Sequence, residues 1–259
     1  MKTDMYEMVL EALLRIKHQL NIVVIGANDG KINDPIYDFV MEMSGRTKIL
    51  FIEPNKALLP YLQDNYSLHP SYQIANCAIG KEGILALYVI KKEWWDRFSP
   101  DYAKGWPSYR AATGITSSVK SHLEKALLLV NINPDDALEV INVPSKELKT
   151  LSVEIQWPIP IDVLQIDTEG CDDLVIYASN IEYTKPKIIY FENHHMPQDR
   201  IELLLQYLSK NNYKTHTIGP NSLSIYSRFD ISGISLNIII FVFRIMRKLT
   251  VITKRLITR

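Results

Sequence analysis

Residues 22–30 read IVVIGANDG, and residues 48–53 read KILFIE. Each apolar run is typical of a buried strand. The first leads into a turn whose glycines, Gly26 and Gly30, let the backbone turn sharply and approach a ligand closely. The second run ends in Glu53. In open α/β sheets, ligands bind beyond the carboxyl ends of the strands, where an acid can accept hydrogen bonds from a ribose. The two runs together predict an adenosine-type cofactor site.

The spacing and charge of this turn favour one cofactor over another. A dinucleotide-binding turn reads G-x-G-x-x-G and opens a helix, whereas this one reads G-x-x-x-G and is followed by Asp34. Carboxylates line a pyrophosphate poorly but suit a sulfonium and an ammonium, so S-adenosylmethionine is favoured over a nicotinamide cofactor. A plain strand-to-helix turn with its acids in solvent would explain the loop but not Glu53. The predicted cofactor loop comprises Gly26, Ala27, Asn28, Asp29 and Gly30.

Composition sets limits on the class of protein. The chain has 259 residues, enough for one sizeable α/β domain, with 29 basic and 29 acidic side chains. This balance gives no argument for nucleic acid, and no nucleic-acid partner is expected. Cys77 and Cys171 are the only cysteines, which excludes a disulfide framework and speaks against a cysteine-based zinc site. A reduced, cytoplasmic setting fits these counts.

Apolar runs and helical periods alternate along the chain. This alternation predicts an α/β, Rossmann-like, doubly wound and mostly parallel sheet that is closed by an antiparallel pair, within a domain spanning residues 21–230. Asp34 is the expected N-cap of the helix over residues 35–43. The predicted strands are 22–25, 48–52, 72–75, 85–90, 137–143, 161–170, 187–191, 213–218 and 223–227. The other predicted helices are 56–65, 119–129 and 200–210.

Two segments stand apart from this alternation. Residues 1–20 form a predicted amphipathic helix. Its expected apolar side consists of Met5, Met8, Val9, Leu13, Ile16 and Leu20. Residues 91–118 are rich in aromatics, glycine and proline and follow neither structural period. Connections of this length are lids, binding loops or disordered segments. The aromatic content argues against disorder, which leaves a packing insert or a lid over substrate or cofactor.

With these motifs in hand, the chain resembles the FkbM-type methyltransferases, a branch of the Rossmann-like, S-adenosylmethionine-dependent class. The resemblance covers residues 21–227, nearly the whole predicted domain. It rests on four motifs in order at sheet spacing, each weak alone. They are VVIGANDGKINDPI, FIEPNKALLPYLQDNY, IANCAIG, and VLQIDTEGCDDLVI followed by IIYFENH.

The resemblance implies roles for particular residues. Gly26, Asn28 and Gly30 would form the cofactor loop, and Glu53 would bind the ribose hydroxyls. The adenine would be flanked by Asn76 and Ala78. Many family members carry an acid two residues before the first glycine, where this chain has Val24. Asp29 or Asp34 would then supply the carboxylate for the methionine end.

A second polar cluster follows two later strands. Asp167 and Glu169 end one predicted strand, and His194 with His195 follows the neighbouring one. Methyl transfer requires the acceptor to be positioned and water excluded, and a hydroxyl acceptor benefits from a base. Asp167, Glu169 and His194 are therefore the candidate catalytic residues, with helix capping as the alternative for the two acids. Which histidine acts is left open, and a divalent metal held by this cluster is not favoured.

Three functional hypotheses follow. The resemblance implies O-methylation of a hydroxyl on a saccharide, glycolipid or related metabolite. A methyltransferase-like domain that binds a partner without catalysis is the second hypothesis, motivated by Val24. A nicotinamide-dependent oxidoreductase is the third, weakened by the missing third glycine.

The segment 231–259 differs from the rest of the chain. It contains no acid and six bases: Arg244, Arg247, Lys248, Lys254, Arg255 and Arg259. Its apolar run, residues 238–243, is much shorter than the roughly 20 residues of a spanning helix. Bases among apolar residues at helical intervals favour a helix lying on an anionic membrane surface over one packed on the domain or on a partner. The expected location is cytoplasmic, with peripheral contact to the inner face of a membrane.

Overall fold

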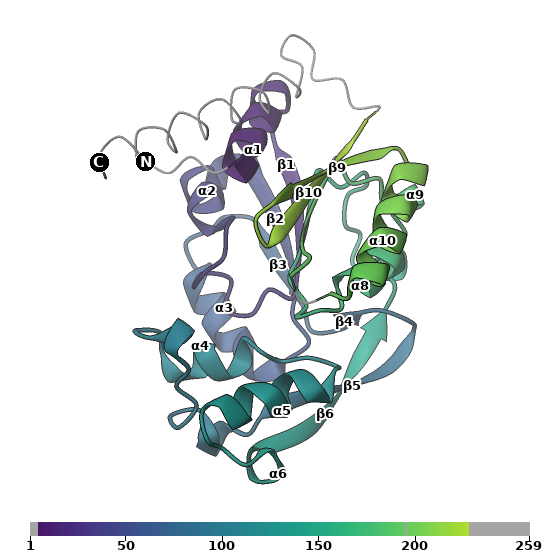
Figure 1. Cartoon of the computed structure of the whole chain (residues 1–259). Helices are drawn as coiled ribbons and strands as arrows, with labels where there is room; N and C mark the ends of the chain where they lie inside the picture. Colours follow the sequence, from purple (N-terminus) through teal and green to yellow (C-terminus); the bar gives the residue numbers. More distant parts are fainter. Residues whose placement is uncertain (1–4, 195, 228–259) are drawn as a thin grey trace, which may run out of the picture.

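Seven strands form the central sheet (Figure 1). They are β1 (Leu20–Ile25), β2 (Thr47–Ile52), β3 (Tyr72–Ala75), β7 (Val163–Ile166), β8 (Ile188–Glu192), β9 (Tyr213–Ile218) and β10 (Asn221–Tyr226). The computed structural model describes residues 5–194 and 196–227. The strand order is β3-β2-β1-β7-β8-β10-β9, with parallel pairing from β3 to β8 and antiparallel pairing of β10 to both neighbours. The predicted mostly parallel sheet with a closing antiparallel strand is confirmed.

The central position of β1 explains its sequence. It pairs with β2 on one side and β7 on the other, and Ile22, Val23, Val24 and Ile25 are all buried. Strands of a parallel sheet are covered on both faces and therefore read as continuous apolar runs. The carboxyl ends of β1, β2 and β7 meet at one edge, so the loops that follow these strands lie together.

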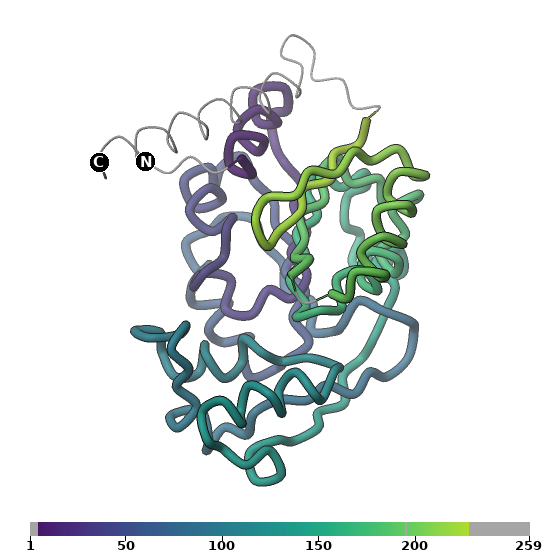
Figure 2. Tube along the Cα trace, viewed as in Figure 1, coloured from purple at the N-terminus to yellow at the C-terminus, as the bar shows by residue number. Residues whose placement is uncertain are grey.

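Helices cover both faces of this sheet (Figures 1 and 2). On one face, α1 (Met5–Ile16), α2 (Tyr37–Glu42) and α3 (Leu59–Asn65) pack on the side chains of Ile22 and Val24. On the other face, α7 (Leu148–Glu154), α8 (Asp172–Ala178), α9 (Ile181–Thr184) and α10 (Gln198–Lys210) pack on Val23 and Ile25. Short 3-10 turns at Ser44–Arg46 (η1) and Lys56–Leu58 (η2) precede β2 and α3. The result is a three-layer, doubly wound arrangement.

The first helix belongs to this core, and its buried face overlaps the predicted one in Met5, Val9 and Leu13. Its buried residues are Met5, Tyr6, Val9, Leu10, Leu13 and Leu14. Met8 is only half-buried, Ile16 is 40% exposed, and Leu20 begins β1. Tyr6 stacks on Tyr190 of β8 with ring centroids 4.0 Å apart. The buried stripe therefore includes Tyr6, Leu10 and Leu14 in place of Met8 and Ile16.

A second, three-stranded sheet was not predicted. It consists of β4 (Ala78–Ile79), β5 (Gly83–Ile90) and β6 (Leu138–Lys146) in the order β4-β6-β5, with antiparallel pairing of β5 and β6. The predicted strands 85–90 and 137–143 therefore lie outside the main sheet. Exposed residues recur along both strands, as expected for a sheet covered on one side. This part of the chain lies below the main sheet in Figure 2.

Residues 91–118 are ordered and pack against this second sheet. They contain η3 (Lys92–Trp94), η4 (Asp101–Ala103) and α4 (Ser108–Thr113), and α5 (Lys120–Leu129) and α6 (Pro134–Ala137) follow. Trp95 and Phe98 are buried in a hydrophobic cluster with residues of α4 and α5. We call residues 91–118 the insert. Its aromatic residues form a core of their own, which gives the segment a fixed shape.

No helix in the described part of the chain is long and apolar enough to cross a membrane. The predicted membrane-surface helix lies in residues 231–259, outside the described residues.

Candidate functional site

Gly26 directly follows β1, at the point where three strands converge. Its nitrogen donates to the carbonyl of Ile52 at 3.0 Å, and the nitrogen of Asp167 donates to the carbonyl of Ile25 at 3.0 Å. Gly26 has a positive φ of 76°, and a Cβ built there would lie 1.9 Å from the backbone oxygen of Asp167. Only glycine fits this position, because the ends of β1 and β7 approach too closely for a side chain.

A cavity of about 660 Å³ opens at this edge of the sheet. Its volume lies within the roughly 300–1,000 Å³ of small-molecule sites. Most of the predicted site residues line it: Gly26, Ala27, Asn28, Asp29, Asp34, Glu53, Ala78, Asp167 and Glu169. The structure therefore brings the residues after β1, β2 and β7 to one cavity.

Glu53 holds the predicted cofactor loop in place. It is 4% exposed, its Oε2 accepts a hydrogen bond from the nitrogen of Asn28 at 2.8 Å, and its Oε1 accepts one from Asn55 at 2.7 Å. Burial raises the pKa of Glu53 to about 7. A carboxylate has about four acceptor positions, so each oxygen keeps capacity for one further donor.

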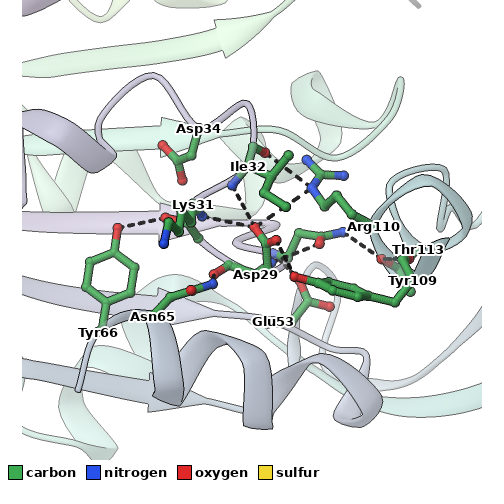
Figure 3. A network of polar contacts seen from close by, with 12 residues as sticks. Asp29, Lys31, Ile32, Asp34, Glu53, Asn65, Tyr66, Tyr109, Arg110 and Thr113 are labelled. Atoms are coloured by element: carbon green, nitrogen blue, oxygen red, sulfur yellow. Dashed lines mark hydrogen bonds and ion pairs between the residues drawn. The ribbon is translucent and has the colours of Figure 1, made fainter. Parts of the chain in front are cut away.

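Asp29 is engaged by protein atoms on both carboxylate oxygens (Figure 3). Its Oδ1 accepts from the nitrogens of Lys31 and Ile32 at 2.9 and 3.0 Å, and its Oδ2 accepts from the Tyr109 hydroxyl at 2.9 Å. Asp29 thereby shapes the loop and ties it to the insert. Contact of its carboxylate with a cofactor, as predicted, stays a prediction.

The insert contributes to the cavity wall. Arg110 donates from Nε to the carbonyl of Ile32 at 3.2 Å, and the Asn28 amide donates to the Thr113 hydroxyl at 3.4 Å (Figure 3). Both insert residues line the cavity. Sequence reasoning missed them, since the only available signal was the aromatic and aperiodic character of the insert. The insert contacts the loop through Tyr109, Arg110 and Thr113, and its role as a lid stays a prediction.

The polar cluster after β7 contains three acids. Asp167 and Glu169 line the cavity, and Asp172 is fully buried. Asp167 is solvent-accessible through the cavity, although protein atoms surround it closely enough for desolvation to raise its pKa. Burial, reinforced by Asp167, Glu192 and Asp172, raises the pKa of Glu169 to about 9. Asp172 accepts hydrogen bonds from the Thr168 hydroxyl at 3.0 Å and the Glu192 nitrogen at 3.1 Å. A pKa of about 9 favours the protonated, neutral form of Glu169 at pH 7, which can donate a hydrogen bond.

Three predicted site residues do not line the cavity. Gly30 has a positive φ of 67° and faces Leu62 and Tyr66, so its absent side chain makes room for the core. The Asn76 amide donates to the carbonyl of Glu53 at 2.8 Å and fixes the end of β2. His194 is exposed in the turn after β8, which ends at Glu192. His195 lies outside the described residues.

Gln165 is a site residue that sequence reasoning missed. Its Nε2 donates to Asp34 Oδ1 at 3.0 Å, and its Oε1 accepts from the Tyr6 hydroxyl at 3.2 Å. Burial raises the pKa of Asp34 to about 6. The predicted N-cap role of Asp34 is wrong: α2 begins only at Tyr37, and Asp34 instead accepts from the nitrogen of Ile36 in the preceding turn. A single polar residue within an apolar strand was the available signal for Gln165.

Within residues 5–194 and 196–227, no group of three or more His, Cys, Asp or Glu side chains is arranged to hold a metal ion.

The raised pKa of Glu53 predicts a pH-dependent stability. Between its ordinary value of 4.5 and about 7, the folded state binds this proton and the unfolded state does not. The free energy of unfolding should therefore fall as the pH rises through this window. Glu53→Gln removes the titrating group, so the wild type should lose about 3 kcal/mol relative to the variant between pH 4.5 and 8. Urea unfolding at several pH values measures this difference, and a difference independent of pH would contradict the assignment.

Comparison with known proteins identifies the family. The family described as the methyltransferase FkbM domain matches residues 25–215, well over half of the chain. No curated protein sequence matches. Among solved structures, similarity is found to a precorrin-6y C5,15-methyltransferase from Geobacter metallireducens, with 11% identity, a TM-score of 0.40, and coverage of 85% of this chain and 86% of that chain. The Methanococcus jannaschii fibrillarin pre-rRNA processing protein has 10% identity and a TM-score of 0.41, with coverage of 82% of this chain and 68% of that chain. M. capricolum TrmK, solved with S-adenosyl-homocysteine, has 10% identity and a TM-score of 0.39, with coverage of 84% of this chain and 66% of that chain. On the extent of the family match, this chain belongs to the FkbM methyltransferase domain family.

Proposed function

We propose that this protein transfers a methyl group from S-adenosylmethionine to a hydroxyl of a saccharide, glycolipid or related metabolite. The observation that carries the proposal is the acid-lined cavity at the carboxyl edge of β1, β2 and β7, in a chain of a methyltransferase family. Ligands of open α/β sheets bind at this edge.

The donor groups of the cavity fit the proposed cofactor. S-adenosylmethionine supplies an activated methyl group on a sulfonium, and it also carries an ammonium and two ribose hydroxyls. Glu53 offers free acceptor positions for the ribose hydroxyls, while Asp34 offers a carboxylate for the cationic end. Ala78, at the start of β4, provides an apolar wall for the base.

Asp34 supports the idea that the acid missing at Val24 is supplied from elsewhere. Val24 is the register partner of Gln165 on β7, and Gln165 donates to Asp34. The Asp34 carboxylate is thus held at the cavity through the strand beside Val24. Its pKa of about 6 leaves it mainly ionised at neutral pH, as binding a cation requires.

The second cluster provides groups for a hydroxyl acceptor. Asp167 can take the proton of the attacking hydroxyl, and the neutral Glu169 can donate a hydrogen bond to another acceptor oxygen. An acceptor with more than one oxygen would use both groups.

Methyl transfer from labelled S-adenosylmethionine into separated cell-extract fractions tests the proposal. Oligosaccharide, lipid and small-metabolite fractions are incubated with the wild type and analysed by mass spectrometry for products that gain one methyl group. We expect products methylated on oxygen. Methylation on nitrogen, carbon or sulfur alone would contradict the hydroxyl assignment. Cofactor binding without transfer into any fraction would favour the non-catalytic binding protein.

A further inference from the structure

Arg110 points from the insert toward the loop after β1 (Figure 3). Its side chain is 12% exposed, and its guanidinium lies 5.2 Å from the centre of the Trp106 ring. Its Nε donates to the carbonyl of Ile32 at 3.2 Å and lies 3.8 Å from Asp29 Oδ1. These contacts fix the direction of the guanidinium at the cavity wall.

Most hydrogen-bond donors of this guanidinium are unused. Arginine has five N–H donors, and in the described part of the chain only Nε of Arg110 has a hydrogen-bond acceptor. The 3.8 Å contact with Asp29 exceeds hydrogen-bond length and also involves Nε. A largely buried cation with free Nη donors is costly unless an acceptor is supplied. Since the residue lines the cavity, a ligand can supply that acceptor.

The loop itself cannot bind an anion through its backbone. From Gly26 to Ile32 every backbone nitrogen already has a protein acceptor. The acceptors are the Ile52 carbonyl for Gly26 and Ala27, Glu53 for Asn28, the Asn28 side chain for Asp29, the Ala27 carbonyl for Gly30, and Asp29 Oδ1 for Lys31 and Ile32. A phosphate-binding loop, by contrast, leaves its amides free for the ligand. An anionic group at this loop therefore needs a side-chain cation.

The proposed cofactor carries one such anionic group. Its amino-acid end pairs an ammonium, which suits the acids of the cavity, with a carboxylate, which those acids repel. The only lysine or arginine side chains lining the cavity within the described residues are Lys81 and Arg110. Lys81 is exposed just after β4, beside the predicted adenine position at Ala78. Arg110 lies at the loop.

We propose that Arg110 binds the carboxylate of the amino-acid end of S-adenosylmethionine through its Nη groups. The inference rests on the proposed function and names the residue that recognises this end of the cofactor. A planar guanidinium can bind a carboxylate through two parallel hydrogen bonds, which fixes its orientation.

Gly114 makes room for this guanidinium. A Cβ built on Gly114 would lie 2.4 Å from Nη1 of Arg110 and 3.0 Å from the Arg110 carbonyl oxygen. The backbone of Gly114, with φ −62° and ψ −20°, is one that alanine adopts without strain. Gly114→Ala should therefore displace the guanidinium while keeping its charge and the helix.

Calorimetric titration of the full chain with S-adenosylmethionine and with its decarboxylated form tests the proposal. The two probes share nucleoside, sulfonium and ammonium and differ in the carboxylate. Arg110→Ala should weaken binding of S-adenosylmethionine about ten- to a hundred-fold and that of the decarboxylated probe less than about three-fold. Gly114→Ala should shift the ratio of the two affinities in the same direction, by a smaller factor. Arg97→Ala, the same change at an exposed arginine of the insert that does not line the cavity, is the matched control and should leave the ratio of the two affinities unchanged.

The outcomes separate this inference from the proposed function. A wild type that binds neither probe contradicts the proposed function itself. A wild type that binds S-adenosylmethionine, with the ratio unchanged in Arg110→Ala, overturns the role of Arg110 alone. Equal weakening of both probes in Arg110→Ala also overturns it, because that result assigns the arginine to holding the insert in place.

Discussion

Gly26→Ala is expected to lower the free energy of unfolding by at least about 3 kcal/mol, or to prevent folding. A non-glycine residue at φ 76° is strained, and its Cβ would lie 1.9 Å from the backbone oxygen of Asp167. That oxygen belongs to the end of β7 and cannot move without separating β7 from β1. Urea unfolding followed by circular dichroism measures the loss.

Gly45→Ala is the matched control for this substitution. A Cβ at Gly45 meets no heavy atom within 4 Å, and its backbone is not in the left-handed region. The change should be near neutral or stabilise by up to about 1 kcal/mol. A Gly26→Ala protein as stable as the control would mean that β1 and β7 do not converge as described.

Asp167→Asn is expected to reduce methyl transfer about 10²- to 10⁴-fold, the range for loss of a general base. Its affinity for S-adenosylmethionine should change less than about three-fold, since the proposed role of the carboxylate is to take the proton of the acceptor. Initial rates with the acceptor found in the extract search, together with calorimetry, separate the two effects. Asp101→Asn, at an exposed position of the insert, is the control. An equal loss in rate and affinity would assign Asp167 to cofactor binding instead.

The parts of the fold that could be predicted from sequence are those fixed by local patterns. Buried parallel strands read as apolar runs, so β1, β2 and β7 were predicted with the acids that follow them. The turn after β1 carries glycines where the backbone needs them, as Gly26 shows. The edge of the sheet where the site lies follows from these strands alone.

The second sheet could not be predicted in the same way. Its strands β5 and β6 are about fifty residues apart, and both expose residues along their length. Apolar runs of this kind fit a strand in either sheet, and only the long-range pairing decides between them. The predicted single sheet failed at this point.

The missed and misplaced site residues have physical reasons as well. Arg110 reaches the cavity only because the aromatic core of the insert holds α4 above the loop, and no local pattern encodes that contact. His194 follows β8, which ends at Glu192, and does not line the cavity, so its catalytic role stays a prediction. Gln165 was read as part of a buried strand, although its amide holds Asp34.

Titration calorimetry of the wild type and Glu53→Ala with S-adenosylmethionine and with NAD tests the central claim most directly. The claim is that the acid-lined cavity is an S-adenosylmethionine site with Glu53 at the ribose. The wild type should bind S-adenosylmethionine and not NAD, and Glu53→Ala should bind it about ten- to a hundred-fold more weakly, as expected for lost hydrogen bonds to a charged group. Binding of NAD alone, or wild-type affinity for S-adenosylmethionine in Glu53→Ala, would contradict the account.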